Sequence, residues 1–136
     1  MAHIYSYLTF SGNCRKAMTF YQHCLGGNLS FRTIGETPVS AEMTEEMKGY
    51  VVQATLTKED LILVGTDLVA DEGLTKGNAV SLLLNCNSEE ELTTYYAKLS
   101  VGAKATQAIE VNFWDTLVAS VTDVFGNNWL LNYKRN

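Results

Sequence analysis

Few residues of this chain have the type and spacing of a catalytic or metal-binding group. Its two histidines, His3 and His23, are far apart, and His23 falls within a predicted helix. Cys14 directly follows a predicted helix cap, where a helix dipole can lower the pKa of a thiol. However, no histidine lies near Cys14 in the sequence to act as its base. A nucleophilic Cys14 and a ligating His3 therefore stay as alternatives to purely structural roles.

A second group of residues is suited to binding a small molecule without covalent chemistry. Gln53 lies on a predicted strand, and its amide is both a donor and an acceptor. Trp114 follows a strand and could wall a pocket, since an indole combines flat apolar area with one N–H donor. The other candidates lie on the first and last strands: Tyr5, Tyr7, Trp129 and Asn132. Strand hydrogen bonding would equally explain Gln53, and a solvated strand end would equally explain Asn132. For Trp129 core packing is the favoured interpretation, and for Tyr5 and Tyr7 it is cross-strand packing.

Strands and two helices must position these candidates. Apolar patterns predict strands at 4–10, 29–34, 50–57, 61–64, 79–86, 104–110, 115–122 and 128–133. One helix is predicted over 14–25, with Asn13 as its N-cap and Gly26-Gly27 at its end. A second runs to about Leu99, and Ser88 with Glu91 forms its capping box. Residues 36–48, which include the only proline, predict a loop with a short helix.

The two halves of the chain repeat each other. A shift of 75 positions places Asn13 on Ser88 and Gly27 on Gly102. Each copy reads as a strand, a capped helix, a glycine turn and further strands. A duplicated unit of this kind cannot bury its sheet alone, so we expect the copies to pair around a cleft. This predicts an α+β fold in which two βαβββ modules form one cupped mixed sheet.

A single domain is the simplest organisation for 136 residues, because this length supports one good core. We expect module one at about 1–66, a crossover at about 67–78, and module two at about 79–136. The crossover contains glycines but no long linker, so we place no domain boundary within it.

Composition excludes several classes of function. Hydrophobic residues make up 46% of the chain and charged residues 18%, which is typical of a globular protein. A net charge of −5 without a basic run disfavours nucleic acid, whose phosphates require clustered Lys and Arg. No apolar run approaches the ~20 residues that span a membrane. The N-terminus lacks signal-peptide features, and the three cysteines lack CxxC spacing, so we expect a cytoplasmic protein with reduced thiols.

Motifs spread over the whole chain are similar to those of one known family. They are residues 7–14, Ala17, Phe20-Tyr21, Gly26-Gly27, Phe113-Trp114, residues 122–126 and Trp129. The chain resembles the vicinal-oxygen-chelate superfamily of glyoxalase I, fosfomycin-resistance proteins and extradiol dioxygenases. Within it, the match is to the PhnB-like group, sometimes labelled 3-demethylubiquinone methyltransferase-like. Because many members complete or cover their cleft with a partner, the resemblance also implies a homodimer.

The resemblance implies a divalent metal on the open face of the sheet, held by His, Glu or Gln from the first and fourth strands of each module. In this chain, those positions fall on Tyr5 or Ser6, on 61–64, on 79–81 and on Leu130. None of these residues is a good ligand for a divalent metal. We therefore expect the conventional metal site to be absent, and no cofactor.

Two main functions remain. We favour a metal-independent small-molecule binding protein, with its ligand in the cleft of the cupped sheet. The alternative is a divalent-metal-dependent lyase, isomerase or dioxygenase whose ligands come from His3, Glu110 or a partner chain. A dimeric module without a ligand is a third possibility. A methyltransferase activity finds no support, since there is no GxGxxG loop after the first strand and no βαβ alternation.

Overall fold

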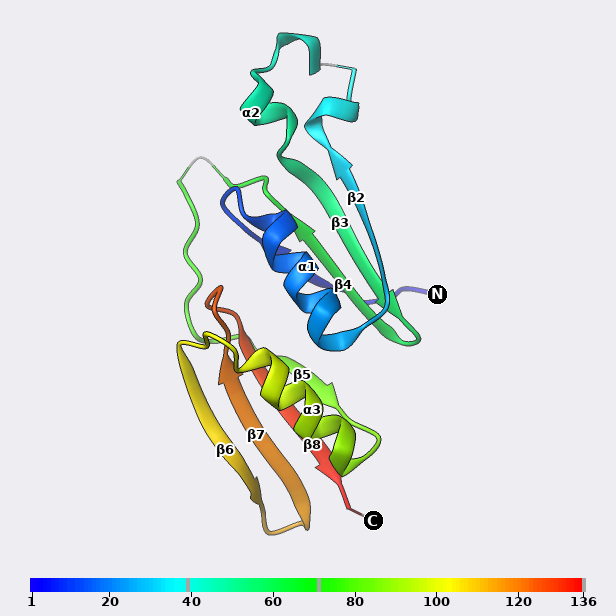
Figure 1. Ribbon diagram of the computed structural model, residues 1–136, viewed down its shortest axis with the longest axis vertical. Helices are drawn as coiled ribbons and strands as arrows, with labels where there is room; N and C mark the ends of the chain where they lie inside the picture. Colours follow the sequence, from blue (N-terminus) through cyan, green and yellow to red (C-terminus); the bar gives the residue numbers. More distant parts are fainter. Residues whose placement is uncertain (39, 71, 136) are drawn as a thin grey trace. The chain divides into compact units, whose positions relative to one another are not determined.

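The computed structural model describes residues 1–38, 40–70 and 72–135, and it divides into two compact units, 1–75 and 76–136. Each unit contains one four-stranded mixed sheet and a long helix (Figure 1). The strand order is β1-β4-β3-β2 in the first sheet, here called sheet A, and β5-β8-β7-β6 in the second, here called sheet B. The predicted α+β class with two βαβββ modules is confirmed. The joining of the two sheets into one cupped sheet stays a prediction.

Unit 1 contains sheet A and its covering helix. Its main elements are β1 (Ser6–Thr9), α1 (Cys14–Leu25), β2 (Asn28–Thr33), β3 (Val51–Lys58) and β4 (Leu61–Thr66). Two 3-10 turns, η1 (Ile34–Glu36) and η2 (Ser40–Glu42), and the short helix α2 (Glu45–Lys48) connect β2 to β3. The predicted loop with a short helix is therefore confirmed. It lies at the far end of the β2–β3 pair from the β3–β4 turn (Figure 1).

Unit 2 repeats this order with a much shorter connection between its second and third strands. Its elements are β5 (Leu82–Asn85), α3 (Glu89–Leu99), β6 (Ala105–Val111), β7 (Thr116–Thr122) and β8 (Asn128–Lys134). β1 pairs parallel with β4, as β5 does with β8, and the other neighbours in each sheet are antiparallel. The internal repeat that the sequence indicates is therefore a repeat of topology.

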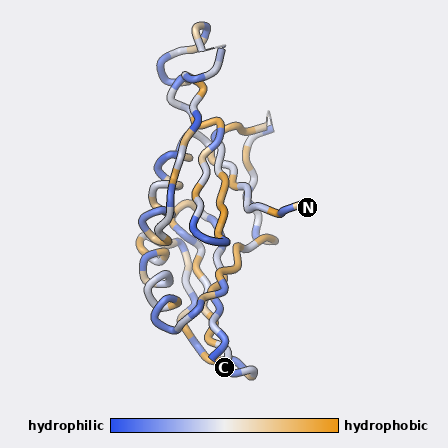
Figure 2. Tube along the Cα trace, turned by 90° about the vertical axis from the view of Figure 1, so that its right-hand side faces the viewer, coloured by the Kyte–Doolittle hydropathy of each residue, from blue (hydrophilic) through white to orange (hydrophobic). Residues whose placement is uncertain are grey.

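The cores lie between each helix and one face of its sheet. In unit 1, Cys14 and Met18 of α1 are buried against Gly65 of β4, where an added Cβ would lie 3.0 Å from both sulfur atoms. In unit 2, Leu92 and Leu99 of α3 are fully buried. The coils of both helices alternate between hydrophilic and hydrophobic residues (Figure 2), as expected for helices with one buried face.

The N-terminus of α1 differs from the prediction. The Asn13 side chain makes no capping hydrogen bond. Instead, the Asp67 carboxylate accepts the backbone N–H groups of Gly12 and Cys14 at 3.0 and 2.9 Å. Asp67 follows β4, so the helix start is held by a residue distant in sequence. In α3 the predicted cap is confirmed, because the Ser88 hydroxyl accepts the Glu91 N–H at 3.0 Å.

The first strand of each module is shorter than predicted. Residues 4–10 were expected to form a strand, but β1 covers only Ser6–Thr9, and β5 covers Leu82–Asn85 of the expected 79–86. Each is an edge strand with a single neighbour, so its length is limited by where β4 or β8 can pair with it. Apolar composition alone does not reveal this limit.

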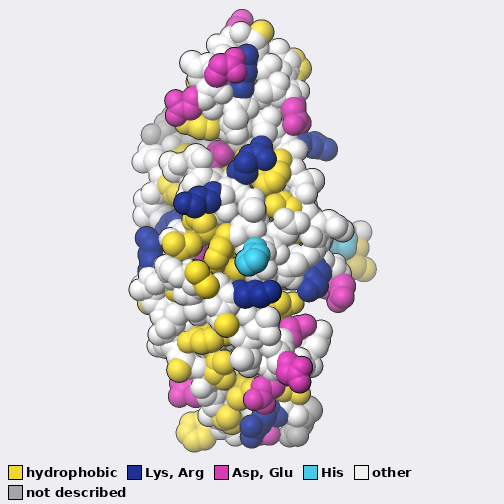
Figure 3. Space-filling model, in the orientation of Figure 1, with side chains coloured by type: hydrophobic (Ala, Val, Ile, Leu, Met, Phe, Trp, Pro, Cys, Tyr) yellow, Lys and Arg dark blue, Asp and Glu magenta, His cyan; other side chains and the backbone are white. Residues whose placement is uncertain are grey.

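On the face that Figure 3 shows, charged side chains are distributed rather than clustered. On the face seen in Figure 3, Lys and Arg lie among Asp, Glu and apolar side chains and form no continuous basic patch. This face lacks the concentrated positive charge on which nucleic-acid binding depends. None of the helices in the described part of the chain is long and apolar enough to cross a membrane.

Candidate functional site

The face of sheet A opposite α1, here called the helix-free face of sheet A, carries two of the predicted ligand-binding residues, Gln53 and Tyr7. Strand register places Gln53 beside Arg32, and Tyr7 beside Val64, which has Thr55 on its other side. Phe31 points to the other face, where its ring lies 4.3 Å from the Arg15 guanidinium of α1. Alternation along the strands therefore gives the helix-free face Tyr7, Thr9, Ile62, Val64, Thr66, Gln53, Thr55, Thr57, Asn28, Ser30 and Arg32.

Polar side chains on this face make few hydrogen bonds with one another. The Gln53 amide donates to the Thr55 hydroxyl over 3.4 Å, a long contact. Arg32 is exposed and forms no ion pair with any acid among the described residues. Tyr7 is 61% exposed, and Tyr5, which directly precedes β1, is 52% exposed. These groups are free to contact another molecule.

The corresponding face of sheet B is more self-contained. Its polar side chains pair across strands: Ser120 with Gln107 at 3.3 Å, Thr122 with Asn128 at 2.8 Å, and Asn132 with Asn85 at 3.3 Å. Asn132 shares this face with Leu130, as expected from the sequence, but its amide already donates to Asn85. Among the polar positions of the two faces, those of sheet A are therefore better suited to a ligand.

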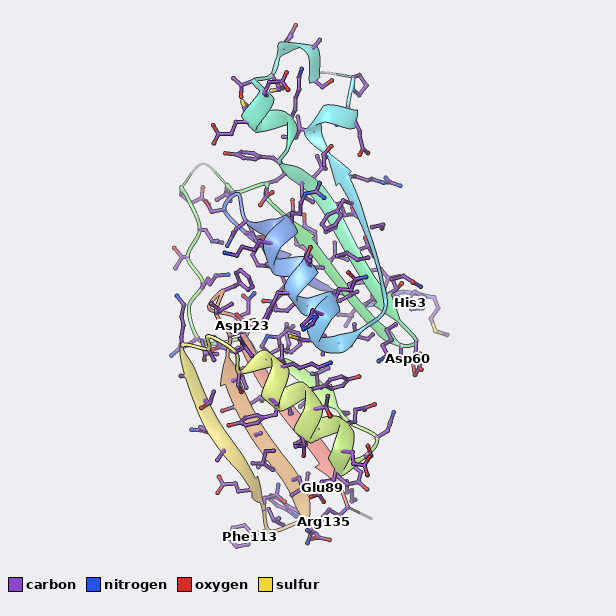
Figure 4. All side chains as sticks on the ribbon, viewed as in Figure 1. His3, Asp60, Glu89, Phe113, Asp123 and Arg135 are labelled. Carbon is purple, nitrogen blue, oxygen red and sulfur yellow. The ribbon has the colours of Figure 1, made fainter. Side chains whose placement is uncertain are left out.

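Trp114 lies on the turn between β6 and β7. It is 74% exposed, and the neighbouring Phe113 is fully exposed at the same end of the unit, close to Arg135 (Figure 4). The Asn112 side-chain oxygen accepts a hydrogen bond from the backbone N–H of Trp114 at 2.9 Å. Asp115 adopts φ +58°, a conformation that glycine adopts more readily. Its carboxylate forms an ion pair with the Arg135 guanidinium at 2.7 Å. The turn is well fixed, and its aromatic side chains point outward.

Trp129 lies in the core of unit 2. Its side chain is 1% exposed, and its indole N–H donates to the buried Asp123 carboxylate at 2.8 Å. In β8, Trp129 alternates with Leu130, so it points to the face of sheet B that α3 covers. This placement agrees with the core-packing interpretation, and we leave Trp129 out of the ligand surface.

The structure buries Cys14 completely, which disfavours a nucleophilic role. Burial, with a smaller contribution from the Asp67 carboxylate, raises the pKa of the Cys14 thiol from 9.0 to about 12. The Asp67 charge at the helix start opposes the effect that was expected of the dipole. All three cysteines are buried thiols. At neutral pH, Cys14 is a protonated core side chain.

The donor set does not suit a divalent metal. Neither helix-free face carries a histidine, and Glu110 is the one carboxylate on them. His3 lies on the exposed segment before β1 (Figure 4), stacked against Tyr5, and His23 is exposed on α1. No group of three His, Cys, Asp or Glu side chains that could hold a metal occurs within residues 1–38, 40–70 and 72–135.

Sequence reasoning did not select Arg32 or Asp67. For Arg32 a signal exists, because a strand over 29–34 with apolar Leu29 and Phe31 on one face places Arg32 on the other. Asp67 has no local signal, since its partners Gly12, Cys14 and Val51 belong to other elements.

This arrangement of two mixed sheets, each covered by one helix, defines the class of protein. A solved glyoxalase/bleomycin resistance protein/dioxygenase family enzyme from Burkholderia phytofirmans PsJN has the same fold, with a TM-score of 0.65 and 14% identity over 96% of both chains. A family model described as 3-demethylubiquinone-9 3-methyltransferase matches residues 2–131. The chain belongs to this family, and the resemblance to the PhnB-like group is confirmed.

Two relatives match along nearly the whole chain. Protein YjdN of Escherichia coli (strain K12) is 29% identical over 134 residues, which cover 93% of this chain and 91% of YjdN. The crystal structure of PA1353 from Pseudomonas aeruginosa is 27% identical, with a TM-score of 0.83 and full coverage of both chains. Both modules of the chain are therefore shared with these relatives.

Proposed function

We propose that the protein binds a small molecule without a metal, and that the helix-free face of sheet A supplies most of the contacts. The exposed Arg32, which forms no ion pair with any of the described residues, carries this proposal. Tyr5 and Tyr7 are also more than half exposed. On sheet B, by contrast, Gln107 pairs with Ser120 and Asn132 with Asn85 across strands. Exposed aromatic area beside a few polar groups is the usual composition of a small-molecule site.

The donor set argues against the alternative of a metal-dependent lyase, isomerase or dioxygenase. Such chemistry requires a divalent ion held by several imidazole or carboxylate ligands. The positions that the family would use carry Tyr5 or Ser6, residues 61–64, residues 79–81 and Leu130, none of which suits that role. Glu110 and His3 would need further ligands from another chain.

We further propose a homodimer joined through the edges of β1 and β5. Exposed sheet edges are usually protected by charges or bulges. The β2 and β6 edges carry Arg32 and Glu110 beside register shifts, whereas β1 and β5 have neither a charge nor a shift. Light scattering of the intact chain is expected to give twice the 15.0 kDa of one chain, and a mass of 15.0 kDa contradicts the dimer.

Amide chemical shifts during titration with a library of small organic molecules test the binding proposal. Binding compounds are expected to shift residues of β1, β2 and β3 in preference to α1. Replacing Gln53 with Ala removes one hydrogen-bonding group, so affinity should fall about fivefold. Gln107→Ala is the matched control, because Gln107 is an exposed strand glutamine of sheet B, outside the proposed binding face. A library without binders, or shifts confined to α1, would contradict the proposal.

A further inference from the structure

The helix-free face of sheet A changes in character from one edge to the other. At the β2 edge lie Asn28, Ser30 and Arg32, and at the β1 edge lies Tyr7, next to Val64 of β4. Gln53 and Thr55 of β3 lie between these two ends. The face therefore carries a cationic and polar margin on one side and an exposed aromatic side chain, Tyr7, on the other, while Val64 is only 7% exposed.

Arg32 is the only charged side chain at the strand positions of this face. No acid among the described residues forms an ion pair with it, and its cross-strand neighbour is the neutral Gln53. A guanidinium presents several N–H donors in a fixed plane that matches the oxygens of a carboxylate, sulfonate or phosphoryl group. A second donor from the Gln53 amide lies on the adjacent strand.

The sheet register shifts at this position. Arg32 pairs with Gln53, but Thr33 pairs with Val51, so Val52 has no partner in β2. A bulge of this kind re-aims the neighbouring side chains and is common beside binding sites. The shift therefore changes the local backbone next to Arg32 and Gln53, whereas residues 28–31 of β2 pair regularly with β3.

We propose that the ligand of this face is an organic anion with an apolar or aromatic body. Its anionic group binds Arg32 and Gln53, and its body lies over Thr55 toward the 61% exposed Tyr7, passing the 7% exposed Val64 of β4. Three strand spacings of about 4.8 Å across the sheet and an offset of two residues along the strands separate Arg32 from Tyr7, so head and body together extend about 16 Å. This inference rests on the proposed function and adds the charge, polarity and orientation of the ligand.

Two fluorescent probes that differ by one group separate these claims. Anilinonaphthalene sulfonate carries an anionic head on an aromatic body, and N-phenylnaphthylamine is the same body without the sulfonate. Arg32→Gln is expected to lower the affinity for the sulfonate probe about tenfold, which corresponds to the loss of one charge-assisted hydrogen bond. The affinity for the neutral probe is expected to change less than twofold. Arg32→Lys keeps the charge without the fork and should give an intermediate loss.

Lys16→Gln is the matched control, because Lys16 is exposed on α1 and its loss changes the net charge equally. Lys16→Gln should leave the affinities for both probes unchanged. Thermal melts of all variants check that each is folded. Equal affinity of the sulfonate probe for wild type and Arg32→Gln, or equal weakening of both probes, overturns the anion proposal while the binding surface stands. If neither probe binds the wild type, the anion proposal is wrong, and the library titration decides whether the binding function fails with it.

Discussion

Replacing Asp67 with Asn is expected to destabilise the protein by about 3 kcal/mol, because buried backbone donors lose a charged acceptor. The Asp67 carboxylate accepts the N–H groups of Gly12 at 3.0 Å, Cys14 at 2.9 Å and Val51 at 2.9 Å. It thereby joins the turn after β1, the start of α1 and the start of β3. An asparagine offers one oxygen and places an N–H₂ group against at least one of these donors.

Urea unfolding measures this loss, which corresponds to a fall in Tm of roughly 10 °C for a chain of this size. Asp60→Asn is the matched control, since Asp60 is exposed on the β3–β4 turn, and it should change stability by less than about 0.5 kcal/mol. A stability of Asp67→Asn within about 1 kcal/mol of wild type would show that these bonds do not hold the module together.

The second large effect is expected in the core of unit 2. Trp129→Phe should cost about 2 kcal/mol, from the smaller ring and from the lost hydrogen bond to Asp123. Asp123 also accepts the N–H groups of Phe125 and Asn127 at 2.9 and 3.0 Å, so the indole fixes a carboxylate that shapes the turn before β8. Trp114→Phe is the control, because that indole is exposed, and it should be nearly neutral.

A double-mutant cycle with Asp123→Asn isolates the contribution of the Trp129 hydrogen bond. Unfolding free energies of the two single variants and the double variant should give a coupling of about 1 kcal/mol. Strict additivity of the two changes would mean that the indole stabilises the core by packing alone. Additivity would also mean that the 2.8 Å hydrogen bond between Trp129 and Asp123 does not couple the turn before β8 to the core.

The sequence contained most of the fold because its strongest signals are local. The helix predicted over 14–25 begins and ends where α1 does, since its apolar spacing and the glycines after it lie within one segment. The internal repeat of the sequence predicted two modules of the same topology, and the two sheets have equivalent strand order. The strand ends and the Asp67 cap could not be predicted in this way, because both depend on contacts between distant segments.

Prediction of the candidate site was less complete. Gln53 and Tyr7 were selected by side-chain type, and the register places both on the helix-free face of sheet A. Arg32 was missed because a single arginine in a strand has no distinctive pattern, and its surroundings become visible only with the cross-strand register. Trp129 was selected for its chemistry, but an indole in an apolar strand serves the core equally well.

The most direct test of a metal-independent binding function is the metal content of the intact chain, purified without a histidine tag and measured by mass spectrometry. Thermal melts with added Ni²⁺, Zn²⁺, Mn²⁺ and Fe²⁺ accompany it, because an ion that binds the folded state raises Tm. We expect far less than one metal per chain and no rise in Tm with any ion. A near-stoichiometric metal, or a clear rise in Tm with one ion, would contradict this account and favour a metal-dependent enzyme.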